Sequence, residues 1–274
     1  MSIQLTTGDV AGQTNQAAAL LRAGQLEQAL QALSARVRSA PGDAGERVFL
    51  FQLLSLMGQW QRAGEQLQTA QQLDAGLSLM VTTCKVLLDA EAERAQVFNE
   101  VALPHVLGTP EPWLAAMLKA LQLEQQGQVA AAASLREQAL EQAPAVAGQI
   151  DGLGFQWLGD ADMRFGPCLE VISQTGYAWV PLSQVQQVRI DAPSDLRDMV
   201  WIPAELAWRN GSQSIVFIPS RYPGTQSVAD GHLRMARATQ WDSDGRGLGQ
   251  RMFASDQGEH PLLETRLIEF QAPL

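Results

Sequence analysis

The chain has 274 residues, a length that accommodates one large domain or two domains of ordinary size. Its formal net charge is −10, shared evenly by the two halves, and 18% of its residues are charged. Nucleic acid and anionic membrane surfaces are therefore excluded as principal partners, because binding to either requires clustered lysine and arginine.

The N-terminal residues, Met1 to Asp9, contain neither a positively charged region nor an apolar run, so they do not resemble a secretory signal. No run of 18 apolar residues occurs in the chain, which predicts that no helix spans a membrane. Cys84 and Cys168 lie too far apart in sequence to form a metal motif or a disulfide framework. These features predict a cytoplasmic protein with two reduced, buried or half-buried thiols.

Three short stretches of the first half repeat one another, and they begin at Gly24, Gly58 and Gly127. The step from Gly58 to Gly127 is twice the step from Gly24 to Gly58, with one extra residue. Pro41 follows Gly24 at the same distance at which Pro144 follows Gly127. A period of about 34 residues with this punctuation is typical of stacked helix–turn–helix pairs of the tetratricopeptide type. Such stacks form concave surfaces that bind other proteins.

Apolar residues at helical spacing predict the helices of each pair. Residues 14–38 form the first pair, and Gly24 suits its turn because glycine accepts a positive φ without a Cβ clash. Residues 48–57 are apolar almost all round, which predicts a helix buried between its neighbours. The further elements that we expect are a helix over 78–100, a loop over 104–112 and a third helical pair over 113–143.

The second half changes character after Pro144, because short strands replace the alanine- and glutamine-rich helices. Five of the seven tryptophans lie here, and all of its basic residues are arginines. Residues 185–190 alternate between apolar and polar, as a half-buried strand does. Asn210-Gly211 separates two strand-like runs, and this dipeptide predicts a tight hairpin turn in which both residues have positive φ. Several short strands at near-regular spacing predict a small curled sheet or barrel, with a short helix within 231–238.

The sequence therefore predicts a multidomain α and α+β protein. Residues 1–147 are expected to form a tetratricopeptide-like helical repeat domain, of which residues 1–13 are disordered. Residues 148–274 are expected to form a β-rich domain. Because a single helical pair cannot cover its own apolar side, at least three pairs must stack to build a core, and the stack leaves a concave groove.

No arrangement of residues typical of catalysis is apparent. His105, His232 and His260 have no second histidine or cysteine at ligand spacing, which argues against a zinc site. The nucleophile elbow, the Walker loop and the dinucleotide-binding fingerprint are absent, and we interpret the glycine-rich residues 245–249 as a flexible turn. We therefore predict no catalytic residue, no cofactor and no metal.

Asp160 and Asp162 support an enzymatic alternative. Two carboxylates on one side of an extended segment suit a divalent cation, so a metal-dependent hydrolase that also uses His232 is a competing hypothesis. Aspartates in such positions more often bond to their own backbone in a turn, or pair with an arginine, here Arg164 or Arg197.

Aromatic and arginine side chains of the second half are the candidates for contact with a partner, because these residue types dominate binding hot spots. Arg221 and Tyr222 stand together in a compact turn, and the alternative for them is a packed tyrosine beside a solvated arginine. With the two aspartates included, the candidate partner-binding residues are Trp157, Asp160, Asp162, Arg164, Trp179, Arg197, Trp201, Arg221 and Tyr222.

Short blocks of the chain, from about Leu20 to Phe270, match the pattern of a known family. Blocks of the first half include Pro41-Gly42-Asp43-Ala44 and Glu111-Pro112-Trp113. The more specific blocks are Ile150-Asp151-Gly152, Asp160-Ala161-Asp162, Trp179-Val180-Pro181, Leu196-Arg197-Asp198, Arg221-Tyr222-Pro223-Gly224 and Gly247-Leu248-Gly249-Gln250-Arg251. Together these blocks resemble the ImpE family of type VI secretion accessory proteins, from which the chain departs by extra residues before its first helix.

The resemblance implies a non-enzymatic, cytoplasmic bacterial protein that works with the contractile sheath of the type VI secretion system. It implies binding to a helix near the N-terminus of the small sheath subunit, and an indirect link to sheath handling by the ClpV unfoldase. We expect that helix to lay its apolar face in a groove of the helical stack, of the β-rich domain or of their junction. A structural component that stays in the assembled sheath is a third hypothesis.

Overall fold

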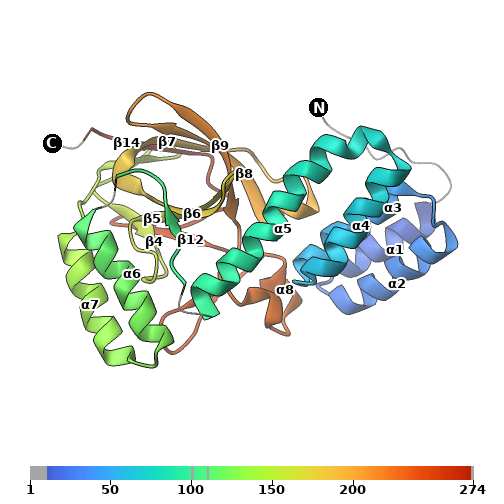
Figure 1. Ribbon diagram of the computed structural model, residues 1–274, viewed down its shortest axis with the longest axis horizontal. Coiled ribbons are helices and arrows are strands. Elements are labelled where there is room, and N and C mark those ends of the chain that lie inside the picture. The colour runs from blue at the N-terminus through green and yellow to red at the C-terminus, as the bar shows by residue number, and fades with distance from the viewer. Residues whose placement is uncertain (1–10, 100–101, 110, 273–274) are drawn as a thin grey trace.

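The computed structural model describes residues 11–99, 102–109 and 111–272. Within these residues, seven helices occupy the first half: three antiparallel pairs and the long helix α5, which runs diagonally between the second and third pairs (Figure 1). This arrangement confirms the predicted helical stack. The helices are α1 (Ala11–Arg22), α2 (Leu26–Ser39), α3 (Ala44–Leu56), α4 (Trp60–Leu73), α5 (Ser78–Asn99), α6 (Pro112–Gln125) and α7 (Val129–Gln142).

The three repeated glycines end the first helix of each pair in the same way. Their φ angles are +74° at Gly24, +67° at Gly58 and +75° at Gly127, which confirms the left-handed turn predicted at Gly24 and places the same turn in the other two copies. Each glycine N–H donates to the carbonyl three residues back, and the next N–H donates to the carbonyl five residues back. This pattern satisfies carbonyls that the helix end leaves without intrahelical donors.

The segment expected to be disordered, residues 1–13, is described only in part. Helix α1 begins at Ala11, so residues 11–13 are helical, and residues 1–10 lie outside the described residues. Within the described part of the chain, no helix has the length and apolarity required to cross a membrane.

Over the described ranges of the chain, nine strands form the main sheet, in the order β1-β6-β5-β9-β8-β7-β14-β2-β3. Among these described strands, only β1 pairs in parallel, and its two residues lie within the segment 104–112 that we expected to be a loop. The sheet is curled and, across the described residues, does not close into the barrel offered as an alternative. Its strands are β1 (His105–Val106), β2 (Gly148–Ile150), β3 (Leu153–Phe155), β5 (Cys168–Ser173), β6 (Gly176–Pro181), β7 (Val185–Ile190), β8 (Trp201–Trp208), β9 (Gln213–Pro219) and β14 (Leu267–Phe270).

Smaller elements complete the second half. A three-stranded sheet has the order β13-β12-β4, and β10 and β11 form a two-stranded ribbon. The predicted short helix is one turn, α8. The bounds are α8 (Gly231–Arg234), β4 (Leu158–Asp160), β10 (Thr239–Trp241), β11 (Gly247–Gly249), β12 (Met252–Ser255) and β13 (Gly258–Pro261), with 3₁₀ turns at Ala75–Leu77, Leu182–Gln184, Leu196–Met199 and Thr225–Ser227.

The hairpin predicted at Asn210-Gly211 exists between β8 and β9, but its turn differs from the expected one. Gly211 has φ +84°, whereas Asn210 is not among the described residues with positive φ. The connection spans 209–212, and Asn210 Oδ1 accepts hydrogen bonds from the N–H and the hydroxyl of Ser212. A longer loop needs only one left-handed residue, which explains the difference. The two-residue hairpin with both φ angles positive occurs instead at Asp151-Gly152, between β2 and β3.

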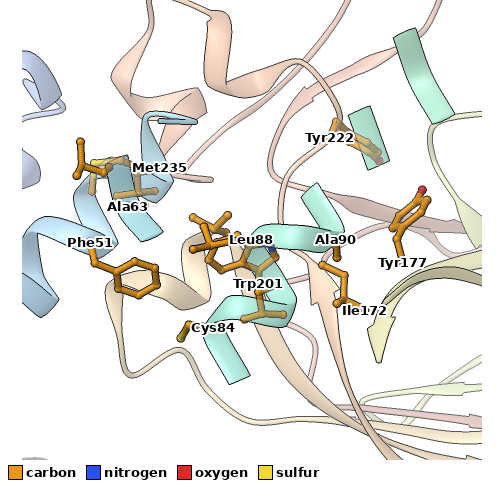
Figure 2. Packing of buried hydrophobic residues seen from close by; sticks show 14 of the residues in the cluster. Phe51, Ala63, Cys84, Leu88, Ala90, Ile172, Tyr177, Trp201, Tyr222 and Met235 are labelled. Atoms are coloured by element: carbon orange, nitrogen blue, oxygen red, sulfur yellow. The ribbon is translucent and has the colours of Figure 1, made fainter. Parts of the chain in front are cut away.

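Helices and strands share one hydrophobic core. Phe51 of α3 and Cys84 of α5 belong to the same buried cluster as Ile172, Tyr177 and Trp201 of the main sheet (Figure 2). A second cluster fills the opposite face of that sheet. The first cluster therefore includes residues from both sides of residue 147, the boundary expected between the helical and the β-rich part.

Arginines of the second half also bond to the ends of helices in the first half. The Arg221 guanidinium donates to the Leu56 carbonyl at the end of α3, at 2.8 Å. Arg237 donates to the carbonyls of Leu21 and Arg22 at the end of α1, at 3.3 and 2.7 Å. Cations at these positions interact favourably with the helix dipole as well as with the carbonyls.

Candidate functional site

A buried ionic network holds helix α5 against the sheet. Arg94 of α5 donates to both carboxylate oxygens of Glu170 in β5, with Nε–Oε1 at 2.8 Å and Nη2–Oε2 at 3.0 Å. Arg94 Nη2 also donates to the Arg221 carbonyl at 2.8 Å. Such two-point pairing fixes the orientation as well as the distance between the two groups.

Arg251 lies at the centre of this network, where it contacts two carboxylate side chains. Its guanidinium bonds to Glu170 and to Asp160, and its side chain is fully buried. The same guanidinium lies over the rings of Phe165 and Tyr222, at 4.6 and 5.2 Å from their centroids. Burial lowers the pKa of Arg251, and Asp160 opposes that shift. The cation is therefore held between two anions and two aromatic faces.

Asp160 and Asp162 take up different partners in the network. Burial raises the pKa of Asp160 from 3.8 to about 6, against the opposing effect of Arg251. The Tyr222 hydroxyl donates to Asp160 Oδ1 at 2.9 Å. Asp162 pairs with Arg164 at 2.5 Å, which confirms the first of the two arginine pairings considered from the sequence. Both aspartates thus bind guanidinium groups of the same chain.

The raised pKa of Asp160 predicts a specific dependence of stability on pH. The folded state binds the proton of the Asp160 carboxyl group more tightly than the unfolded state does. Protonated Asp160 therefore stabilises the fold below about pH 4, and this contribution is lost as the pH rises through about 6. Compared with Asp160→Asn, the wild-type protein should lose roughly 2–4 kcal/mol of unfolding free energy over this range. Urea denaturation of both proteins between pH 4.5 and 7.5 measures the difference, and a difference constant with pH would contradict the prediction.

The aromatic candidates for partner binding are mostly internal. Trp179, Trp201 and Tyr222 are buried. The Trp201 indole N–H donates to Glu91 of α5 at 2.8 Å, and the Trp179 indole N–H donates to the Tyr177 hydroxyl at 2.6 Å. These tryptophans therefore contact other parts of the chain, while Trp157, after β3, is 43% exposed.

Two arginine candidates also contact other parts of the chain. Arg221 and Tyr222 are both buried. The alternative prediction of a packed tyrosine is therefore confirmed, whereas its prediction of a solvated arginine is wrong. Burial lowers the pKa of Arg221 to about 10. Arg197 pairs with Asp195 at 3.0 Å instead of Asp160 or Asp162, and it donates to the Cys84 sulfur at 3.4 Å.

A cleft with a volume of about 400 Å³ opens beside this network. Residues from 91–99 of α5 and from 121–125 of α6 form two of its walls. Two segments of the strand-rich half, containing residues from 223–227 and 242–248, form a third wall, and Trp60 of α4 and Arg164 also line the cleft. The cleft therefore lies at the junction of the helical stack and the strand-rich half, one of the three locations that the sequence left open.

The lining of the cleft combines apolar side chains with internally paired charges. Phe98 and Leu248 are among its apolar residues. Arg164 lies 5.5 Å from the centroid of the Phe98 ring and pairs with Asp162. Arg246 binds Glu124 with Nε–Oε1 at 2.8 Å. A surface of this composition can hold apolar anchor side chains next to polar rim contacts.

Of the nine candidate partner-binding residues, only Arg164 lines the cleft. Sequence reasoning did not single out Trp60, Phe98 or Arg246, because each occupies a position that is equally consistent with packing or solvent exposure. Glu170 and Arg251 were given no role from the sequence. Glu170 is a charged residue within an otherwise apolar strand. This pattern indicates a buried ion pair, because a buried charge requires a partner.

The residues of the hydrolase hypothesis do not converge. His232 stands at the first repeat turn, where a Cβ built on Gly24 would lie 3.3 Å from its ring, whereas Asp160 and Asp162 belong to the network described above. Within the described residues, no group of three or more His, Cys, Asp or Glu side chains is arranged to hold a metal ion. To bind a divalent cation, Asp160 and Asp162 would both have to release the arginine side chains with which they pair.

The fold and the cleft define a helical-repeat protein whose repeats and strand-rich half are built on a shared core. A family model described as ImpE protein matches residues 152–269. The type VI secretion system accessory component TagJ of Pseudomonas aeruginosa (strain PAO1) is 47% identical over 252 residues, covering 92% of this chain and 90% of that protein. The chain therefore belongs to the ImpE family of type VI secretion accessory proteins, which confirms the resemblance.

A solved structure supports the fold independently. The X-ray structure of a Vibrio parahaemolyticus protein matches with a TM-score of 0.84 at 22% sequence identity. The match covers 93% of this chain and 97% of the other. At this identity the likeness establishes the architecture alone.

Proposed function

We propose that this protein is a non-enzymatic, cytoplasmic adaptor that binds the N-terminal helix of the small sheath subunit of the type VI secretion system. The cleft between α5, α6 and the loops of the strand-rich half holds the apolar face of that helix. Through this contact the protein acts on sheath assembly or on recycling of the sheath by the ClpV unfoldase.

The cleft is the observation that carries this proposal. Its volume of about 400 Å³ accommodates a few anchor side chains, whereas an entire helix would remain mostly outside it. Helix-in-groove recognition works in this way, because anchors at i, i+3, i+4 and i+7 project from one face. The buried network beneath the cleft fixes α5, so the groove is already formed before the partner arrives, which reduces the entropy lost on binding.

Calorimetric titration with a peptide copied from the N-terminal helix of the small sheath subunit tests the proposal. We expect binding to the wild-type protein and at least a tenfold loss of affinity, about 1.4 kcal/mol, in Leu248→Asp, which places a charge in the cleft. Leu153→Asp is the matched control, because Leu153 is exposed on β3 and does not line the cleft. Thermal melting verifies that both variants fold.

Two results would refute the adaptor hypothesis. Absence of binding to any fragment of the sheath subunit, with both proteins folded, would refute the contact itself. Co-sedimentation of most of the protein with sheath tubules in fractionated cells would favour the structural-component hypothesis, because an adaptor should stay largely in the soluble fraction.

A further inference from the structure

The three repeat turns have the same backbone but different surroundings. The residue two positions after each glycine begins the second helix of its pair and marks the difference: it is Leu26 in the first copy, Trp60 in the second and Val129 in the third. Leu26 is 0% exposed, Trp60 is partly buried and Val129 is 50% exposed. The equivalent position is therefore fully buried in the first copy, partly buried in the second and exposed in the third.

A single segment of the strand-rich half covers the first two turns. At the first turn, a Cβ built on Gly231 would lie 1.9 Å from the Gly24 carbonyl oxygen and 2.9 Å from Leu26 Cδ1. At the second turn, a Cβ on Gly58 would lie 2.5 Å from the Gln226 side chain. Residues 226–231 thus dock on consecutive turns of the stack, and this position of the repeat already serves as a docking point within the chain.

The third turn has no such cover. None of the described residues places an atom within 4 Å of a Cβ built on Gly127, apart from its own neighbours in the chain. The turn is nevertheless continuous with the cleft, because Leu121, Glu124 and Gln125 of α6 line the cleft and α6 ends at Gln125. A ligand that follows the α6 wall outward therefore meets Gln126, Gly127 and Val129 next.

We infer that the partner helix held by the cleft extends along the end of α6 onto the third repeat turn and buries Val129. This inference rests on the proposed function and adds a second part to the binding surface. The occupant is one amphipathic helix, with apolar anchors in the cleft and one further apolar residue against Val129. In the complex all three repeat turns are then covered, two by this chain and one by the partner.

The test compares two exposed apolar residues, each in the first turn of a helix. Val129→Asp in α7 should lower the affinity for the sheath-subunit peptide about fivefold in calorimetry, because the new charge would be buried at the contact. Leu79→Asp in α5 should leave the affinity unchanged, because Leu79 is 80% exposed and does not line the cleft. An aspartate is well tolerated in the first turn of a helix, so both variants should fold.

Hydrogen exchange supplies a second measurement that needs no variant. Saturation of the wild-type protein with the peptide should slow amide exchange at the start of α7 as well as along the cleft. If the peptide binds and Leu248→Asp weakens it, while Val129→Asp and the exchange of α7 show no change, the extension is refuted and the adaptor function stands. If the peptide does not bind the wild-type protein, both proposals fall together.

Discussion

Replacement of Glu170 by alanine is expected to destabilise the fold by about 3–5 kcal/mol, the range measured when one member of a buried ion pair is removed. Glu170 accepts hydrogen bonds from Arg94, Arg251 and the Tyr177 hydroxyl, and it is 0% exposed. Without it, the two guanidinium groups lose their shared counter-ion inside the protein, although Arg251 keeps Asp160. The cost arises from the charges left behind more than from the contacts removed.

Urea denaturation at pH 7 measures this effect as a shift in the unfolding midpoint. Glu141→Ala is the matched control, because Glu141 is an exposed glutamate of α7 and its loss should change stability by no more than about 0.5 kcal/mol. Glu170→Gln preserves the shape and removes only the charge, so most of the loss should persist in it. A Glu170→Ala variant as stable as the control would show that the network does not join α5 to the sheet.

Replacement of Trp201 by alanine is expected to cost a similar amount, about 3–5 kcal/mol, through loss of packing. The Trp201 ring is 1% exposed and lies 5.8 Å from the ring of Trp60, centroid to centroid. Its indole N–H also donates to Glu91 of α5. Trp201→Phe keeps an aromatic ring but removes that donor, so it should cost about 1–3 kcal/mol and separate the polar contribution from the packing.

The exposed Trp157 supplies the comparison for these variants. Trp157→Ala should change the unfolding free energy by no more than about 0.5 kcal/mol, because its side chain is 43% exposed. Equal losses in Trp157→Ala and Trp201→Ala would contradict the burial described here. A Trp201→Phe variant indistinguishable from wild type would show instead that the bond to Glu91 contributes little.

Local features of this fold could be predicted from the sequence, because nearby residues determine them. Gly24, Gly58 and Gly127 revealed the three turns through their spacing alone, and a left-handed conformation at each requires little beyond a glycine at a helix end. The hairpin between β8 and β9 was recognised for the same reason. The length of the loop in that hairpin could not be predicted, because cross-strand pairing determines it. The hairpin at Asp151-Gly152 was overlooked, although an Asp-Gly pair is a recognised hairpin signal.

The cleft and the network beneath it could not be predicted from local patterns. Arg94 and Glu170 are 76 residues apart, and nothing in the sequence around Arg94 distinguishes a buried partner of a strand from a solvated helical arginine. The cleft combines residues from widely separated segments, including Trp60, Phe98 and Leu248. Their proximity follows from the packing of α5 across the sheet. Tryptophan and arginine content directed attention to the second half, but of the nine candidate residues found there only Arg164 lines the cleft.

The bonds from Arg221 and Arg237 to the ends of α3 and α1 have a consequence for the evolution of this architecture. Repeat arrays usually require a dedicated terminal unit that shields their open end from water. Here the strand-rich half contacts the side of the array instead, and one guanidinium satisfies carbonyls at each of two helix ends. The repeats are therefore bound to their neighbour in the same polypeptide, so duplication or exchange of single repeats, common in freestanding arrays, would leave helix ends unprotected.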